Sequence, residues 1–212
     1  MSTSHPIRVL CVDDHRIVRE GIALIINQQS DMEVVATASS GEESVQMFRR
    51  HRPDVTLMDL QMGAMMNGVE AIRRIRGEDV HAKVVVLTMY IGDEDIHQAL
   101  SAGAVAYLYK NTISDDLIRL IREVHSGQDP VMRPEIQASL KEWAARPRIT
   151  PREVEVLELI SEGMRDREIA RVLGISDKTA YVHVKNILFK LGAKDRTAAV
   201  RAAVRRGILH MV

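Results

Sequence analysis

The chain has 212 residues, 46% of them hydrophobic and 27% charged, and its acidic and basic side chains are equal in number. This composition is typical of globular proteins and excludes a disordered chain, while the length favours two domains. No run of about 18 apolar residues and no secretory leader pattern occurs. We therefore expect no membrane span and a cytoplasmic location, where the lone Cys11, inside an apolar run, is a small buried hydrophobe.

The charges are distributed unevenly along the chain. Residues 1–126 contain 13 Lys and Arg against 18 Asp and Glu, whereas residues 127–212 contain 16 against 11. The first part is therefore acidic and the second basic, by five charges each. Such asymmetry between two parts of a chain indicates different partners, and a basic part is compatible with nucleic acid.

The first part alternates short β-branched and apolar runs with helical patterns. The runs that predict strands are residues 7–12, 34–38, 55–58, 84–88 and 106–109. The candidate helices are residues 15–27, 41–50, 69–76, 93–101 and 113–125. Regular alternation predicts an α/β domain over residues 1–126, with a flavodoxin-like, doubly wound, five-stranded parallel sheet in the order 2-1-3-4-5.

The second part contains no strand pattern. Residues 127–147 are rich in proline and predict a linker with one short helix at 135–144. Residues 148–212 predict an all-α domain of four helices, the first of which opens with a capping box of Thr150 and Glu153 around Pro151. The other three helices are expected at residues 166–173, from after Ser176 to Gly192, and at 197–206.

Polar side chains follow the predicted strands of the first domain where each strand ends. Asp13 and Asp14 follow the first strand, Asp59 the third and Lys110 the fifth, and Thr88 ends the fourth. Because the carboxyl ends of parallel strands meet at one edge, these side chains should converge. Clustered carboxylates need a cation such as Mg²⁺, and a carboxylate can also accept a phosphoryl group. Turns favour aspartate on conformational grounds alone, but that does not account for all five residues.

These residues resemble those of the receiver domains of two-component systems, over about residues 7–125. The matching segments are residues 12–15, 57–60, 86–90 and 102–110. The resemblance implies that a sensor histidine kinase phosphorylates Asp59. It also implies a Mg²⁺ site made by Asp13, Asp14, Asp59 and the backbone carbonyl of Gln61, phosphoryl contacts from Thr88 and Lys110, and a switch role for Tyr107.

One segment departs from the family pattern. Receiver domains usually carry a Met-Pro pair after the acceptor and a glycine eight residues beyond it. Here Met62 is followed by Gly63, and the matching Gly68 is nine residues away. The loop 63–67 is therefore one residue longer and lacks its rigid proline, which leaves the phosphorylation kinetics open.

The helix expected after Ser176 has two distinct faces. Ala180, Val184 and Ile187 belong to an apolar stripe, completed by Leu188 and Leu191, that predicts the domain core. The residues of the other face are Lys178, Tyr181, Val182 and Lys185. A valine between lysines is either a stray apolar residue on a solvated face or a contact to a thymine methyl in the major groove.

Residues 149–208 resemble the LuxR-type helix-turn-helix, in segments 150–153, 168–170, 173–176, 183–188 and 190–192. With the receiver resemblance, this identifies the chain as similar to response regulators of the NarL/FixJ class. The resemblance implies base contacts from Tyr181, Val182 and Lys185, and phosphate-side roles for Lys178, Thr179, His183 and Asn186. His183 could also be a plain surface histidine. Two positions depart from the family: Tyr181 stands where lysine is usual, and Arg165 replaces a serine helix cap, so that Asp166 is expected to cap instead.

We therefore expect a transcription regulator, not an enzyme, that binds promoter DNA in the major groove and forms a homodimer when phosphorylated. In this hypothesis the unphosphorylated domains pack together and mask the reading helix. Two alternatives remain: a regulator whose receiver is never phosphorylated, and an enzyme acting on a phosphorylated metabolite. The aspartates with Thr88 and Lys110 disfavour the first, and the absence of recognisable substrate-binding groups disfavours the second. The receiver resemblance excludes a small quorum-signal receptor.

Overall fold

The structure is a computed structural model that describes residues 5–63, 65–89, 92–110, 114–128 and 134–209. Two positions discussed above, Tyr90 of the receiver-like motif and residue 64 of the long loop, lie outside these ranges. The chain divides into two compact units, which are described separately. Within the described ranges, no helix is both long enough and apolar enough to cross a membrane.

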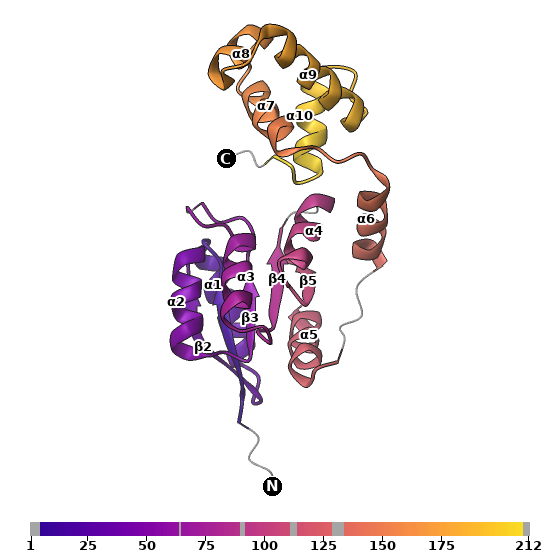
Figure 1. Cartoon of the computed structure of the whole chain (residues 1–212). Helices are drawn as coiled ribbons and strands as arrows, with labels where there is room; N and C mark the ends of the chain where they lie inside the picture. The colour runs from indigo at the N-terminus through magenta and orange to yellow at the C-terminus, as the bar shows by residue number, and fades with distance from the viewer. Residues whose placement is uncertain (1–4, 64, 90–91, 111–113, 129–133, 210–212) are drawn as a thin grey trace. The chain divides into compact units, whose positions relative to one another are not determined.

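The first unit is built on a five-stranded parallel sheet in the order β2-β1-β3-β4-β5 (Figure 1). Its strands are β1 (Ile7–Val12), β2 (Met32–Ala38), β3 (Val55–Met58), β4 (Val84–Thr88) and β5 (Ala106–Tyr109). Its helices are α1 (Arg16–Asn27), α2 (Gly41–His51), α3 (Gly68–Glu78), α4 (Asp93–Ser101) and α5 (Ser114–Ser126). The predicted fold class and strand order are confirmed.

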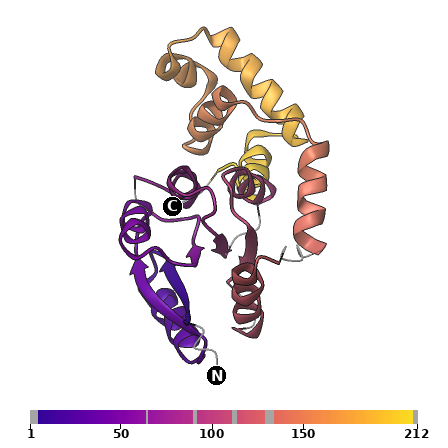
Figure 2. The ribbon, with the colours of Figure 1, turned by 60° about the horizontal axis from the view of Figure 1, so that its bottom comes forward.

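Helices cover the sheet, so strands β3, β4 and β5 are buried along their whole length, without alternation. This is expected where both faces of a parallel sheet are covered. On one face, Ile26 of α1 and Ile121 of α5 belong to the same core cluster as Leu57 and Val85 of the sheet. Helices α1 and α5 therefore cover this face together, and Figure 2 gives a second view of the layers.

The register of the strands determines where the functional residues emerge. Val12 of β1 is paired with Met58 of β3, and Met58 with Val86 of β4. At the end of β4, Thr88 is paired with Tyr109 of β5. The residues that follow these positions therefore leave the sheet at one edge.

The remaining elements are α6 (Pro134–Ala145), α7 (Pro151–Ser161), α8 (Asp166–Leu173), α9 (Asp177–Leu191) and α10 (Arg196–Arg205). Thr150 and Glu153 form the predicted capping box of α7, with Pro151 in its first turn. Ser176 caps α9 by accepting a hydrogen bond from the backbone N–H of Thr179. Helices α8 and α9 each end at a glycine with positive φ, Gly174 and Gly192, as is usual at helix C-termini.

The four helices α7 to α10 surround one apolar core. Ala180, Val184 and Ile187 of α9 are buried in it, whereas Leu188 and Leu191 are only partly buried and pack at its border. The other buried members are Val156, Leu157 and Ile160 of α7, Ile169 and Ala170 of α8, Ala199 and Ala203 of α10, and Leu209. The predicted stripe of α9 is therefore the core face of that helix.

One expectation about helix capping is wrong. Arg165, not Asp166, occupies the cap position of α8, and its side chain makes no capping hydrogen bond. A guanidinium has no acceptor atom, so it cannot satisfy a backbone N–H. Glu168 instead accepts a hydrogen bond from the backbone N–H of Arg165 at 2.7 Å. Asp166 lies inside the helix and forms an ion pair with Arg196.

Candidate functional site

Backbone hydrogen bonds extend the strand pairing to the residues of the acidic site. The N–H of Asp13 donates to the carbonyl of Ala38 at 3.1 Å, and that of Asp59 to the carbonyl of Val12 at 3.0 Å. The N–H of Lys110 donates to the carbonyl of Thr88 at 2.9 Å. These bonds hold the three functional residues at the edge of a rigid sheet, although each lies just beyond its strand.

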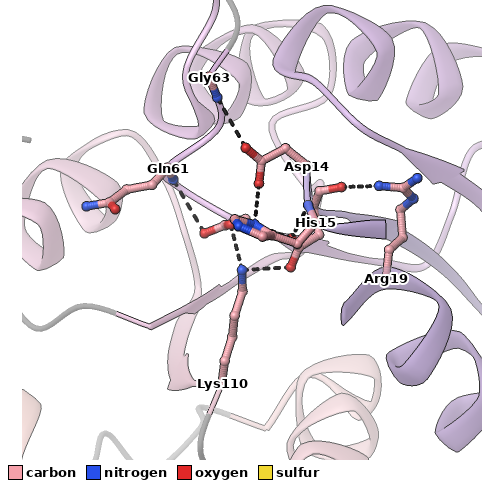
Figure 3. Close-up of polar contacts among 8 residues, drawn as sticks. Asp14, His15, Arg19, Gln61, Gly63 and Lys110 are labelled. Carbon is pink, nitrogen blue, oxygen red and sulfur yellow. Dashed lines mark hydrogen bonds and ion pairs between the residues drawn. The ribbon is translucent and has the colours of Figure 1, made fainter. Parts of the chain in front are cut away.

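The ammonium group of Lys110 lies between two buried carboxylates. Its Nζ is 2.7 Å from Asp13 Oδ2 and 2.6 Å from Asp59 Oδ2, and all three side chains are at most 6% exposed (Figure 3). Such charges are stable in the interior only when they are paired. The lysine therefore offsets part of the negative charge of the two acids and holds them beside each other.

The surroundings shift the pKa values of Asp59 and Lys110 upward. Burial raises the pKa of Asp59, and the nearby Asp13 adds to this, although the hydrogen bond from Lys110 opposes it. Burial alone would lower the pKa of Lys110, but its bonds to Asp13 and Asp59 outweigh this effect and raise the pKa. The lysine is therefore held in its charged form, and Asp59 takes up a proton more readily than an exposed aspartate.

Asp14 is the more accessible acid of the site, with its side chain 32% exposed. His15 Nδ1 is 2.7 Å from Asp14 Oδ1 and 3.6 Å from Asp13 Oδ1. The backbone N–H of Gly63, in the long loop, donates to Asp14 Oδ2 at 3.3 Å (Figure 3). Both carboxylate oxygens of Asp14 are thus contacted from outside the sheet edge.

The donor set fits a divalent cation that prefers oxygen. Asp13, Asp14, His15 and Asp59 each offer one ligand atom, and these atoms lie within 4.8 Å of one another. Three of the four groups are carboxylates, the hard donors that Mg²⁺ prefers. His15 already contacts Asp14, which suits a residue that orients a ligand rather than one that binds the ion. The acidic pocket can hold a metal.

The other residues expected at this site are positioned less directly. The backbone N–H of Gln61 lies 3.4 Å from Asp59 Oδ1, so Gln61 does border the acceptor. Thr88 is buried at the end of β4, next to β3. Tyr107 is also buried, with its ring edge-on to that of Tyr109 at a centroid distance of 5.7 Å. Cys11 is 1% exposed, and burial raises the pKa of its thiol to about 12, so it is part of the core and not a nucleophile.

Two contacts of the site were not predicted from the sequence. The guanidinium of Arg19 donates to the backbone carbonyl of Asp13, and His15 pairs with Asp14. Arg19 lies one helical turn after His15, so their spacing could have placed both near the start of α1. The direction of their side chains depends on packing, which the spacing of residues in the sequence does not determine.

The second surface of interest is the side of α9 that faces away from the core. Tyr181 is 57% exposed and Val182 45% exposed. The other exposed members are Lys178, Thr179, Lys185 and Asn186, while His183 is intermediate. The seven residues predicted to contact DNA thus lie on one helix, six of them exposed and His183 partly exposed. Among the described residues, no ion pair involves either of the lysines at 178 and 185.

The two units match two known family models. Residues 9–122 match the response regulator receiver domain, and residues 147–203 match the bacterial regulatory proteins of the luxR family. The chain belongs to the response regulators of the NarL/FixJ class, which join a receiver domain to a LuxR-type helix-turn-helix domain. It is a DNA-binding transcriptional regulator of a two-component system.

Similar proteins share this organisation over their whole length. The response regulator protein VraR of Staphylococcus saprophyticus is 37% identical over 210 residues, which cover 97% of this chain and 100% of that protein. The crystal structure of the response regulator ChrA of a heme-sensing two-component system is 32% identical, with a TM-score of 0.58 and coverage of 97% and 100%. A complex of the response regulator RcsB with DNA has a TM-score of 0.67 at 24% identity, covering 95% of this chain and 99% of that one, and shows the fold alone.

Proposed function

We propose that Asp59 accepts a phosphoryl group from a sensor histidine kinase and that this modification controls the binding of promoter DNA by α9. The observation that carries the proposal is the position of Lys110, whose ammonium lies 2.6 Å from Asp59 Oδ2 inside a buried acidic pocket. A buried lysine beside the acceptor supplies positive charge where phosphoryl oxygens arrive. The pocket is thus suited to an acyl phosphate.

The transfer step uses the carboxylate of Asp59 as the nucleophile. One of its oxygens forms a bond to phosphorus while the bond from phosphorus to the histidine nitrogen of the kinase breaks, and the released imidazole takes up a proton. A negatively charged phosphoryl group then lies within reach of Lys110. Lys110 exchanges part of its interaction with the carboxylates for one with the phosphoryl oxygens, which favours the phosphorylated form.

We propose Mg²⁺ as the metal, held by Asp13, Asp14, Asp59 and the carbonyl of Gln61, with Asp13 acting through water. When bound, the ion supplies positive charge that neutralises the approaching phosphoryl group. The chain's own contribution is to keep the oxygen donors together: Lys110 fixes Asp13 and Asp59, while His15 orients Asp14. The protein takes up one phosphoryl group, and no turnover of a metabolite is proposed.

Thr88 and Tyr107 are proposed to transmit the modification. Thr88 ends β4 and Tyr107 lies on the neighbouring β5, where Val86 of β4 is its register partner. When the Thr88 hydroxyl moves toward the phosphoryl group, it leaves space behind it. The buried Tyr107 ring is the side chain proposed to move in response. The unphosphorylated domains mask α9 in this proposal, and phosphorylation frees it.

The freed α9 is proposed to read the major groove of double-stranded DNA. Tyr181, Val182 and Lys185 contact bases, and their exposure supports this role. Lys178, Thr179, His183 and Asn186 contact or support contacts with phosphates. We propose that the phosphorylated protein acts in the cytoplasm as a homodimer on two half-sites; the RcsB structures include dimers bound to DNA.

A DNA-binding titration tests the proposal. Wild type, Asp59→Asn and the control Asp115→Asn, which changes an exposed aspartate of α5, are incubated with acetyl phosphate and Mg²⁺ and titrated into labelled promoter DNA. Wild type and Asp115→Asn should bind more tightly after treatment, and Asp59→Asn should not respond. Equal responses of wild type and Asp59→Asn would overturn the proposal.

A further inference from the structure

A basic cavity lies in the helix-turn-helix domain, apart from the exposed face of α9. It has a volume of about 1200 Å³ and is bordered by the end of α7, by α8 and by one side of α10, which Figure 1 labels. One aspartate and one glutamate line it, together with five arginines: Arg165, Arg167, Arg171, Arg196 and Arg201. A concave surface with this excess of positive charge attracts anions.

Both acidic residues of the cavity are already engaged. Asp166 pairs with Arg196, which also donates to the carbonyl of Met164 at 2.9 Å. Glu168 accepts a hydrogen bond from the backbone N–H of Arg165 at 2.7 Å and so stabilises the start of α8. The two carboxylates offset two of the five positive charges, which leaves a net charge of +3 on the cavity lining.

Three arginines of the cavity keep their charge without an acidic partner. Arg165, Arg171 and Arg201 are exposed. In the part of the chain that the structure describes, no carboxylate lies within ion-pair distance of them, whereas Arg167 has Asp177 at 3.4 Å. The three come from the start of α8, the end of α8 and α10, so the fold brings them to one cavity from separate positions. Planar guanidinium groups bind phosphate oxygens in pairs of hydrogen bonds.

Part of the cavity lining is apolar. Ile160 is buried, and Met164 and Val200 are half-buried, and all three line the same space. Pockets that combine an apolar surface with a few convergent polar groups are typical of small-ligand sites. A phosphate of the DNA backbone would use the arginines but not these apolar residues. A nucleotide would use both, with its base on the apolar residues.

We propose that this cavity binds phosphate groups, and that their source is a nucleotide held by Arg165, Arg171 and Arg201. The site gives the DNA-binding domain an input of its own, independent of Asp59. This proposal does not depend on the phosphorylation mechanism proposed above. The backbone of bound DNA is the other source of the same chemistry, and the experiment separates the two.

The first arm of the experiment measures nucleotide binding. ADP and inorganic pyrophosphate are titrated by calorimetry into the full chain, into a variant that combines Arg165→Gln, Arg171→Gln and Arg201→Gln, and into the control Arg205→Gln. Arg205 is an exposed arginine of α10 that does not line this cavity. Wild type and control should bind ADP more tightly than pyrophosphate, because pyrophosphate has no base to contact the apolar residues of the lining. The triple variant should bind ADP at least about tenfold more weakly.

The second arm measures DNA affinity as a function of salt. If wild type does not bind ADP and the triple variant has a salt slope shallower by about 2 to 3, the arginines contact DNA phosphates and the nucleotide assignment is overturned. If neither ADP binding nor the salt slope depends on the arginines, the cavity is not a phosphate site. Retained promoter binding in that case would leave the proposed function intact.

Folding controls accompany both arms. The thermal midpoint of the triple variant should equal that of wild type, because the exchanged side chains are exposed. The single variants Arg171→Gln and Arg201→Gln, each expected to weaken ADP binding several-fold, keep the test decisive if the triple variant is less stable. Unchanged ADP affinity in both single variants and in the triple variant would contradict the proposal.

Discussion

The acidic pocket and the reading face of α9 carry out their tasks by opposite physical means. In the pocket, Asp13, Asp59 and Lys110 are buried, and the one lysine pairs with both carboxylates. On α9, Tyr181 and Val182 are about half exposed, and the lysines beside them are open to solvent. Substitutions in the pocket should therefore change stability and chemistry together, whereas substitutions on α9 should change binding alone.

The largest expected effect comes from Lys110→Met. Removing the ammonium leaves two buried carboxylates without their cation, which should lower the free energy of unfolding by about 3 to 5 kcal/mol. Urea denaturation of the protein, followed by a signal from the receiver domain, measures the loss of unfolding free energy. Lys83→Met removes a lysine whose Nζ donates to the carbonyl of His125 and pairs with no carboxylate among the described residues; it is the matched control and should cost much less. Equal midpoints for wild type and Lys110→Met would show that the pair contributes nothing to stability.

Glu153→Gln tests a buried charge outside both functional surfaces. Glu153 Oε2 accepts from Lys190 Nζ at 2.6 Å and from the N–H of Thr150 at 2.7 Å, so the variant should cost about 2 kcal/mol. Although burial opposes it, these bonds lower the pKa of Glu153 below its usual value. Its contribution is therefore complete above the pKa of the unfolded chain, about 4.3, and is lost as the pH falls through the lower folded value. Thermal melts at pH 7 and pH 3 measure this, and the variant's deficit should shrink at pH 3.

Lys185→Gln tests the exposed face of α9. It should weaken promoter binding by about tenfold to a hundredfold, because a lost base contact costs about 1 to 3 kcal/mol. The unfolding midpoint should not change, because this lysine has no ion-pair partner among the described residues. Fluorescence anisotropy with labelled DNA gives the affinity, and Lys194→Gln, outside the reading helix, is the control. A large loss of stability in Lys185→Gln would contradict the distinction between the two surfaces.

The smallest effect is expected at the rim of the pocket. Gly63→Pro removes the N–H that contacts Asp14 Oδ2 and restores the proline that is usual in receiver domains. Because this hydrogen bond competes with a metal for Asp14, the variant should bind Mg²⁺ about fivefold more tightly, which corresponds to about 1 kcal/mol. Gly63→Ala keeps the N–H and should behave as wild type in a Mg²⁺ titration. Weaker Mg²⁺ binding by Gly63→Pro would mean that the loop supports the site.

Much of the fold could be predicted because parallel strands buried on both faces leave uninterrupted apolar runs. The predicted bounds of β1, β3, β4 and β5 agree with the structure. The exception is β2, which begins at Met32 rather than at residue 34. Glu33 interrupts its apolar run, and this is tolerated because β2 is at the edge of the sheet.

The site was predictable to the extent that topology determines it. Strand ends at one edge bring Asp13, Asp59 and Lys110 together whatever their rotamers. The contacts of His15 and Gly63 with Asp14 depend on loop geometry and side-chain rotation, which local sequence does not determine. Arg165 as the cap residue of α8 is a similar case, because the tertiary pair of Asp166 with Arg196 competes with local capping.

The pairing of Asp59 with Lys110 also has a consequence for the newly made chain. The two residues are 51 positions apart, and Lys110 follows β5, the last strand of the sheet and one of its edges. At roughly 5 to 20 residues per second, the lysine is synthesised about 3 to 10 s after the aspartate. During that interval the three aspartates already exist without Lys110, so the segment that follows the last strand brings the lysine that offsets part of their negative charge.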